Sequence, residues 1–256
     1  MTIQQQKQYK ALLIGDSCND VYHYGRCTRI SPEAPVPVFS ESHVSVLKGM
    51  SSNVAENLKS LGISVTHLKN QTNIEKHRFI DSSYNQQMFR YDSGDCNKVD
   101  ECSLGEIRQH TDETFDVIVI SDYDKGFVGK KTVDFVKMHF SGIPIFVDTK
   151  KKDISMYQGC YVKINEKEYH SLYEKPERCH FIVTLGSGGA TYSGKVFPTR
   201  KVDVFDVVGA GDVFLSGLVY GFMKYHEMER AIGIANHLAS ISVTKQGTYV
   251  VNRSDL

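Results

Sequence analysis

The chain has 256 residues, enough for one α/β domain with a substantial core, or for one domain with a small appendage. Lys and Arg number 30 and Asp and Glu number 30, so no net charge draws the protein to nucleic acid. The six cysteines form no Cys-x-x-Cys pair, which argues against a zinc site, and the polar N-terminus lacks the apolar core of a signal peptide. We therefore expect a cytoplasmic protein with reduced thiols and no membrane or nucleic-acid partner.

The first predicted strand covers 11–15 and ends in Gly15-Asp16. In open α/β sheets ligands bind where the strands end, so Asp16 and Asp20 are candidate substrate contacts. Turn chemistry is the alternative for both residues, because Asp side chains also stabilise loops by bonding nearby backbone.

A proline-rich segment, 26–38, holds half of the six prolines and cannot be helical. It leads into alternating stretches that are typical of a small, partly exposed sheet. Residues 76–81 and 86–92 predict a hairpin that returns to this sheet. We expect a single domain over 1–256, with lid elements at about 24–48 and 76–92.

A helix is predicted over 54–61, with Ser51 or Ser52 as its N-cap and Gly62 at its end. Asn53 stands at the start of this helix. Its amide is a candidate substrate contact, and capping of the helix is the alternative.

Strands over 115–123 and 143–148 flank a predicted helix at 130–140, and this β-α-β order implies a mainly parallel sheet. Two further strands, 161–164 and 181–185, end in Asn165-Glu166-Lys167-Glu168 and Gly186-Ser187-Gly188-Gly189. Because parallel strands end at the same edge, these polar and glycine residues mark that edge as a ligand site.

The heptapeptide Asp206–Asp212 contains Gly209-Ala210-Gly211 and opens an apolar helix predicted to run to about Tyr225. Glycines without side chains, followed by the free N–H groups of a helix start, form a binding site for phosphate. Asp212 is then a candidate base that removes a proton from an attacking hydroxyl. The alternative for Asp212 is an ordinary first-turn Asp that complements the helix dipole. A last helix is expected over about 228–244.

Taken in order, these motifs resemble the ribokinase/phosphofructokinase-B superfamily of sugar kinases. The shared motifs are Gly15-Asp16, Gly49-x-x-x-Asn53, Asn165-x-x-Glu168, Thr184-x-Gly186-x-x-Gly189 and Gly209-Ala210-Gly211-Asp212. Two more stretches are similar to the D-glycero-D-manno-heptose 7-phosphate kinases, which occur as free kinases or as the kinase half of a bifunctional enzyme. These stretches are 29–38, Arg-Ile-Ser-Pro-Glu-Ala-Pro-Val-Pro-Val, and Ser121-Asp122-Tyr123-x-Lys125-Gly126.

The resemblance implies a three-layer α/β/α ribokinase-like fold with a small β-sheet lid. It also implies ATP-dependent phosphorylation of the anomeric hydroxyl of D-glycero-D-manno-heptose 7-phosphate to the 1,7-bisphosphate. Each implied role falls on residues of this sequence: the base on Asp212; the anion hole on Gly209, Ala210 and Gly211; sugar binding on Asp16, Asp20, Gly49 and Asn53; the nucleotide border on Thr184, Gly186, Gly188, Gly189 and Asn236; and organisation of Mg²⁺ and the phosphates on Asn165 and Glu168.

ATP and Mg²⁺ are the implied cofactors, with Glu168 as a direct or water-mediated metal ligand, and a monovalent cation is compatible with the resemblance. A homodimer through the lid is the expected assembly. Met50 stands where the family has a small residue, so a kinase for another sugar or sugar phosphate is one alternative. The second alternative is a catalytically impaired sugar- or nucleotide-binding homologue, against which the retention of Asp212, Asn165 and Glu168 argues.

Overall fold

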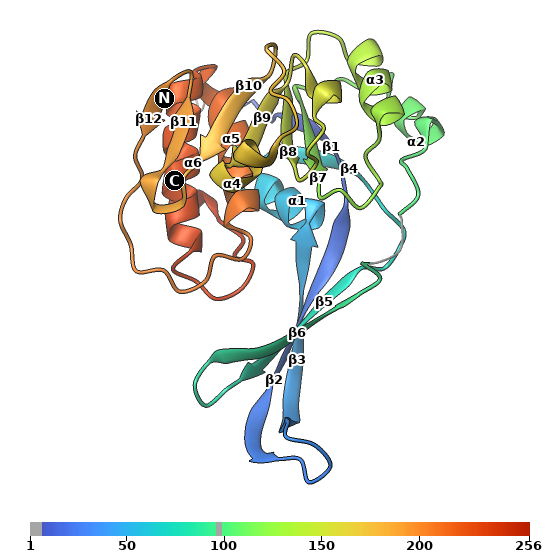
Figure 1. The fold of residues 1–256 in the computed structure, drawn as a ribbon. Helices are drawn as coiled ribbons and strands as arrows, with labels where there is room; N and C mark the ends of the chain where they lie inside the picture. Colours follow the sequence, from blue (N-terminus) through green and yellow to red (C-terminus); the bar gives the residue numbers. More distant parts are fainter. Residues whose placement is uncertain (1–6, 96–98) are drawn as a thin grey trace.

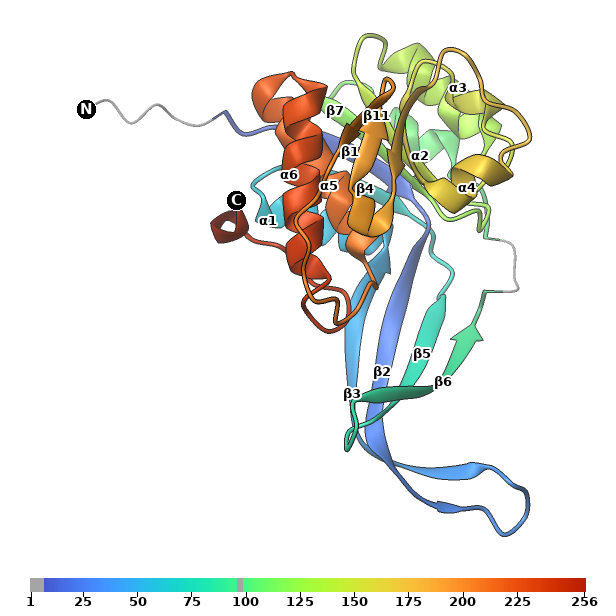
Figure 2. The same cartoon turned by 60° about the vertical axis from the view of Figure 1, so that its left-hand side comes forward.

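The computed structural model describes residues 7–95 and 99–256. Cys96 and the first six residues, on which the expectations of reduced thiols and of no signal peptide partly depend, lie outside the described residues. Figures 1 and 2 show an α/β body from which a narrow sheet projects. The candidate site lies where these two parts meet.

The body is built on an eight-stranded sheet with the order β12-β11-β10-β9-β8-β7-β1-β4. Neighbours from β4 to β10 pair in parallel, whereas β11 and β12 add an antiparallel edge. The mainly parallel sheet predicted from the β-α-β order is thus present. Its strands are β1 (Lys10–Gly15), β4 (Ser64–Lys69), β7 (Val117–Asp122), β8 (Ile145–Thr149), β9 (Tyr161–Asn165), β10 (His180–Thr184), β11 (Ala190–Tyr192) and β12 (Lys195–Phe197).

Helices cover both faces of this sheet, because its central strands are apolar on both sides. Leu13 belongs to the core cluster under α1, α5 and α6, while the adjacent Leu12 belongs to the cluster under α2 and α3. The result is a three-layer α/β/α body (Figure 1). Its helices are α1 (Ser51–Ser60), α2 (Leu104–Arg108), α3 (Lys130–His139), α4 (Glu166–Ser171), α5 (Ala210–Tyr225) and α6 (Met228–Ser242), with single 3₁₀ turns η1 (Ser155–Tyr157), η2 (Gly186–Gly188) and η3 (Arg253–Asp255).

The projecting sheet has the order β3-β2-β5-β6 and is called the lid sheet below. Its strands are β2 (Ser17–Ile30), β3 (Pro37–Met50), β5 (Glu75–Asp81) and β6 (Gln86–Ser93). The predicted hairpin of β5 and β6 joins this sheet through parallel pairing of β5 with β2. Since β2 follows β1 closely and β3 runs directly into α1, the lid sheet is rooted at the ligand-binding edge of the body.

The predicted serine cap of α1 is wrong. The N-cap residue is Met50, and no side chain caps the helix. The Ser51 hydroxyl instead donates to the carbonyl of Gly15 at 3.1 Å, and Ser52 shares a hydrogen bond of 2.6 Å with Ser17. Both serines therefore fasten the root of the lid sheet to the body. The predicted helix end is correct, because Gly62 follows α1 with a φ of +90°.

Met50 has a φ of 55° and a ψ of −135°, a backbone conformation that strains any residue with a Cβ. Its side chain is 3% exposed and packs into the core cluster that also holds Cys18 and Ile74. The bulk that distinguishes Met50 from a small residue is thus accommodated by the core.

Two short helices have no counterpart in the sequence-based expectations. Helix α2 begins after Ser103, whose hydroxyl accepts the N–H of Gly105 at 3.2 Å, and α4 begins after Asn165. Both are too short to show a helical repeat of apolar residues, which explains why periodicity does not reveal them.

The α5–α6 contact predicts opposite effects for two helical glycines. A Cβ at Gly221 would lie 2.7 Å from the Cα of Ala231, whereas a Cβ at Gly233 would meet no described atom within 4 Å. Gly221→Ala should lower the free energy of unfolding by about 1–3 kcal/mol through overpacking. Gly233→Ala should raise it by about 0.5–1 kcal/mol through helix propensity. Urea denaturation of both variants measures this, and equal effects would contradict the packing described.

Candidate active site

The carboxyl ends of the parallel strands form the candidate site. The strand β1 has β4 on one side and β7 on the other, so the chain leaves β1 at a topological switch point, where open α/β sheets bind ligands. Asp16 follows β1, and Tyr123 follows β7. The first turn of α5 and the root of the lid sheet meet the body at this same edge (Figure 1).

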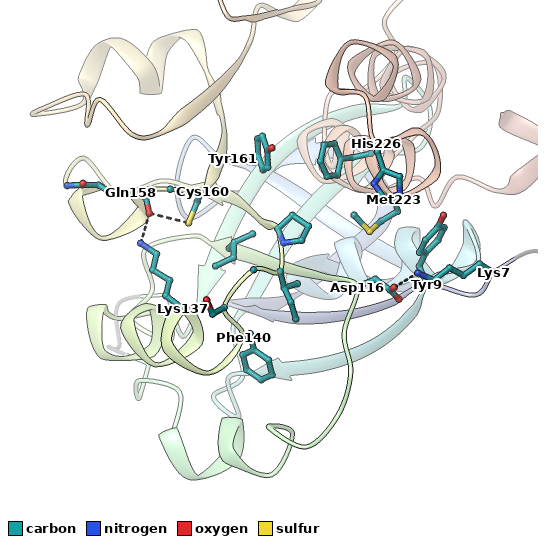
Figure 3. Close-up of a pocket in the computed structure, with 17 residues that line it drawn as sticks. Lys7, Tyr9, Asp116, Lys137, Phe140, Gln158, Cys160, Tyr161, Met223 and His226 are labelled. Atoms are coloured by element: carbon teal, nitrogen blue, oxygen red, sulfur yellow. Dashed lines mark hydrogen bonds and ion pairs between the residues drawn. The ribbon is translucent and has the colours of Figure 1, made fainter.

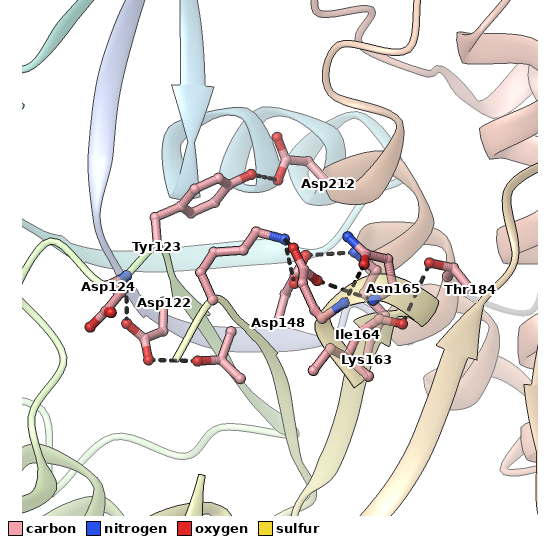
Figure 4. A network of polar contacts seen from close by, with 12 residues as sticks. Asp122, Tyr123, Asp124, Asp148, Lys163, Ile164, Asn165, Thr184 and Asp212 are labelled. Carbon is pink, nitrogen blue, oxygen red and sulfur yellow. Dashed lines mark hydrogen bonds and ion pairs between the residues drawn. The ribbon is translucent and has the colours of Figure 1, made fainter. Parts of the chain in front are cut away.

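Asp212 lies in the first turn of α5 and is only 3% exposed. The Asn53 side-chain amide donates to its Oδ2 at 2.9 Å. The Tyr123 hydroxyl donates to its Oδ1 at 2.8 Å (Figure 4). Burial raises the pKa of Asp212 to about 6, although both hydrogen bonds lower it. Asp212 is therefore ionised at neutral pH and close in pKa to that pH, which suits a general base.

The glycines before Asp212 permit close approach of other groups. Gly209 adopts a φ of +77°, and a Cβ there would lie 2.9 Å from the amide nitrogen of Asn53. A Cβ at Gly211 would lie 2.9 Å from the ammonium of Lys163. The positive end of the helix dipole at the start of α5 favours an anion beside these glycines, although the N–H of Ala210 already donates to the carbonyl of Val207 at 3.3 Å.

Lys163 belongs to a cluster of charged side chains whose centre is closed to solvent, whereas the outer members Lys150 and Glu168 are 31% and 22% exposed. Its Nζ lies 2.7 Å from Oδ2 of Asp148, and the side chains of this pair are 4% and 2% exposed. Lys150 lies 2.7 Å from Oε1 of Glu168 and 3.6 Å from Oδ1 of Asp148. Although burial alone would raise the pKa of Asp148, the ammonium groups of Lys163 and Lys150 hold it below its usual range.

Asn165 and Glu168 form the capping box of α4. The Asn165 side chain accepts the N–H of Glu168 at 2.8 Å, and Oε2 of Glu168 accepts the N–H of Asn165 at 3.1 Å. The second carboxylate oxygen of Glu168 bonds Lys150. The candidate metal organiser Glu168 is thus linked through Lys150 to the buried Asp148–Lys163 pair, both members of which are labelled in Figure 4.

A cavity of about 450 Å³ opens beside the first turn of α5. It brings together Ala210 and Gly211 with four of the five residues that the sequence associates with the nucleotide. Those four are Thr184, Gly186, Gly189 and Asn236. Gly188 is not among the residues that line it, although it belongs to the same turn, η2.

The lid sheet contributes Asp20, which is 4% exposed and pairs with the guanidinium of Arg78 on the adjacent strand. A Cβ on Gly49 would collide with Oδ2 of Asp20. Glycine at this position therefore lets β3 pass directly beside the carboxylate.

Asp16 does not join the other candidate substrate contacts. It is fully buried, and its carboxylate accepts the backbone N–H groups of Tyr123 at 2.7 Å, Lys125 at 3.3 Å and Phe127 at 3.2 Å. Asp16 thus stabilises a loop by accepting backbone N–H groups, as the alternative for this residue proposed, rather than facing a ligand. The loop that it stabilises is the distant segment 123–127 and not the turn in which Asp16 itself lies.

Tyr123, Lys163 and Arg78 are site residues to which sequence reasoning gave no role. Lys163 carries a recognisable signal, because a lysine between Val162 and Ile164 inside an apolar strand must find a buried partner. Tyr123 and Arg78 lack such a signal, since their partners Asp212 and Asp20 are 89 and 58 positions away.

A second cavity, of about 600 Å³, lies at the opposite edge of the sheet (Figure 3). Tyr9, Asp116, Ile145 and Tyr161 line it at the amino ends of their strands. It contains none of the candidate residues and lies away from the edge at which α/β sheets bind ligands.

Across the described residues, no three His, Cys, Asp or Glu side chains gather closely enough to hold a metal ion by themselves. One buried acceptor fits a hydrated Mg²⁺ nearby: within the described chain, Oδ1 of Asp148 has no hydrogen-bond partner. Mg²⁺ keeps several waters and takes phosphate oxygens as ligands, so carboxylates near bound phosphates would contact the ion through its waters.

Two solved kinase structures share this architecture. Ribokinase from Thermotoga maritima superposes with a TM-score of 0.70 at 17% identity, covering 96% of this chain and 97% of that one. Phosphofructokinase-2 from Escherichia coli gives 0.73 at 17% identity, covering 97% and 96%. The fold is therefore the three-layer ribokinase-like α/β fold with a second, small sheet, as the sequence predicts.

Residues 133–254 match the pfkB family carbohydrate kinase model. The "Bifunctional protein HldE" of Pseudomonas fluorescens is 30% identical over 97% of this chain, and that of Sulfurimonas denitrificans is 31% identical over 96%. The chain spans 62% and 63% of the lengths of these relatives. The match over 133–254 identifies a pfkB family carbohydrate kinase domain within the chain. Residues 7–95 and 99–256 include no helix long and apolar enough to cross a membrane.

The Asp148–Lys163 pair predicts a large loss of stability when one partner is removed. Lys163→Met should lower the free energy of unfolding by about 3–5 kcal/mol, because Asp148 is left as an uncompensated buried charge. Adding Asp148→Asn to that variant should recover part of the loss. The exposed pair Lys130–Asp134 is the control, and Lys130→Met should change stability by about 0.5 kcal/mol or less. Denaturant titration measures the free energy of unfolding of each variant. Similar losses of stability in Lys163→Met and Lys130→Met would contradict the prediction.

Proposed function

We propose that the protein phosphorylates the anomeric hydroxyl of D-glycero-D-manno-heptose 7-phosphate with ATP, giving the 1,7-bisphosphate. The observation that carries the proposal is Asp212, a buried carboxylate held by Asn53 and Tyr123 at a glycine-rich helix start. A base at this position lies beside the cavity that Ala210 and Gly211 line, so acceptor and donor would meet there.

In the proposed reaction Asp212 takes the proton of the anomeric hydroxyl, and that oxygen attacks the γ-phosphorus as ADP leaves. Negative charge grows on the transferring phosphoryl oxygens. The proposed anion hole of Gly209, Ala210 and Gly211 would stabilise this charge, with the ammonium of Lys163 close to Gly211. The N–H of Ala210, which donates to the carbonyl of Val207 at 3.3 Å, would have to turn to the phosphoryl group. Most of the catalysis would then come from positioning and electrostatics rather than from covalent chemistry.

The nucleotide would occupy the 450 Å³ cavity. The proposed contacts around it are Thr184, Gly186, Gly188, Gly189 and Asn236. Bound Mg²⁺ would neutralise charge on the ATP phosphates. Asn165 and Glu168 would organise it through water, with Asp148 close by, and a monovalent cation remains part of the proposal without an assigned ligand.

Sugar hydroxyls would contact Asp20, Gly49 and Asn53, with Asp16 acting through the loop it holds. A group of three cations supports a phosphorylated sugar, although two of them are paired with carboxylates, Arg78 with Asp20 and Arg90 with Asp92. Lys76 and Arg78 pair in register with Asp92 and Arg90 of β6, so that Lys76, Arg78 and Arg90 share one face of the lid sheet. Because Lys76 also lies 5.4 Å from the ring centre of Tyr123, this face is turned toward Asp212.

Two observations favour a heptose 7-phosphate over other sugar phosphates. The 29–38 and 121–126 stretches are similar to the heptose 7-phosphate kinases, and the relatives named above are HldE proteins. The burial of Met50 in the core also weakens the argument that its bulk selects a different sugar.

The opposite face of the lid sheet supports the proposed homodimer. Val46 pairs with Val21, and Phe89 pairs with Phe79, on the face turned away from Asp20. Val46 and Phe89 are each 56% exposed, so a second copy would remove apolar surface from water.

Asp212→Asn should lower kcat by at least about 10³-fold, since the amide cannot take the proton while the fold and the nucleotide cavity persist. ADP release with ATP, Mg²⁺ and D-glycero-D-manno-heptose 7-phosphate measures turnover, and calorimetry with ATP measures binding. We expect ATP affinity to change by less than about threefold. Turnover of the Asn variant at the parent rate would show that Asp212 is not the base.

A further inference from the structure

Tyr123 occupies the junction between the lid sheet, the nucleotide side and the proposed base. Its ring centre lies 5.4 Å from the ammonium of Lys76 on β5 and 5.5 Å from that of Lys150 after β8. Its hydroxyl donates to Oδ1 of Asp212 at 2.8 Å (Figure 4). Two cations beside the ring are favourable because the aromatic face is electron-rich.

The loop that carries Tyr123 is fixed from both sides by buried carboxylates. Asp16 accepts the backbone N–H groups of residues 123, 125 and 127. Asp122, also fully buried, accepts from the hydroxyls of Tyr157 at 2.6 Å and Thr149 at 2.8 Å, and from the ammonium of Lys151 at 2.7 Å. Such extensive anchoring allows little movement of the Tyr123 backbone.

We propose that Tyr123 is a positioning residue for the proposed base: its hydroxyl fixes the orientation of the Asp212 carboxylate and solvates its negative charge. The inference rests on the proposed function of Asp212. Asn53 donates a hydrogen bond to Oδ2 of Asp212, and Tyr123 donates one to Oδ1. Each carboxylate oxygen therefore keeps a lone pair that can take the proton of the acceptor hydroxyl.

Tyr123 remains a donor over the working pH range, because burial and the charge of Asp212 raise its pKa well above the usual value. Other charged or titratable groups also face Asp212: Asp148 on β8, Lys163 on β9, Lys150 after β8 and Cys18 on β2. A Phe at position 123 leaves all of these in place and removes only the hydroxyl.

The test is Tyr123→Phe. The hydrogen bond from Tyr123 lowers the pKa of Asp212, so its loss should raise that pKa above about 6. Activity requires the ionised carboxylate, and the acid limb of kcat/KM should therefore move to higher pH. The variant should lose about fivefold more kcat/KM at pH 6 than at pH 8. The carboxyl titration of Asp212, followed by ¹³C NMR with Asp212→Asn for assignment, should move in the same direction.

Tyr157→Phe is the matched control, because it removes a tyrosine–carboxylate hydrogen bond from the same loop network without touching Asp212. It should leave the Asp212 titration where it is in the parent protein. An unchanged titration in Tyr123→Phe, or an equal movement in both variants, would overturn the proposal. The NMR readout needs no turnover, so a parent protein inactive on heptose 7-phosphate would refute the proposed function and still allow this test.

Discussion

The structure depends on the two hydrogen bonds that hold the buried carboxylate of Asp212. Asn53 brings α1 to this carboxylate, and Tyr123 brings the loop after β7, so one side chain at the start of α5 joins three segments that are distant in sequence. A buried carboxylate is costly unless such donors compensate it. The site can therefore form only when the sheet, α1 and the 123–127 loop are all in place, which couples the base to the fold.

Two buried ion pairs lie on either side of this base. On the nucleotide side, the Asp148–Lys163 pair places an ammonium beside Gly211, and Lys150 connects the pair to Glu168. On the sugar side, Asp20 and Arg78 form a second buried pair within the lid sheet. Each ammonium or guanidinium in these pairs is balanced by a carboxylate, so the pairs fix charges on both sides of Asp212 without adding net positive charge.

Local patterns were enough to predict most of the fold. Apolar runs that end in polar or glycine residues revealed the parallel sheet, and Gly209-Ala210-Gly211-Asp212 marked the start of α5. Local patterns did not predict which residues far apart in the sequence would pair. Ser51 and Ser52 are typical caps by type, yet they bond Gly15 and Ser17 across the root of the lid sheet. Asp16 stabilises a loop more than 100 positions away, and Tyr123 finds Asp212 only in the folded chain. The roles of the candidate site residues remain predictions.

Identification of the product tests the central claim most directly. The protein is incubated with ATP, Mg²⁺ and D-glycero-D-manno-heptose 7-phosphate, and in parallel with fructose 6-phosphate or ribose, and the products are examined by ³¹P NMR. The account predicts one new phosphate ester, coupled to the anomeric hydrogen, that forms with the heptose phosphate and in equal amount to ADP. A phosphate at another hydroxyl, or turnover only with a different sugar, would contradict it.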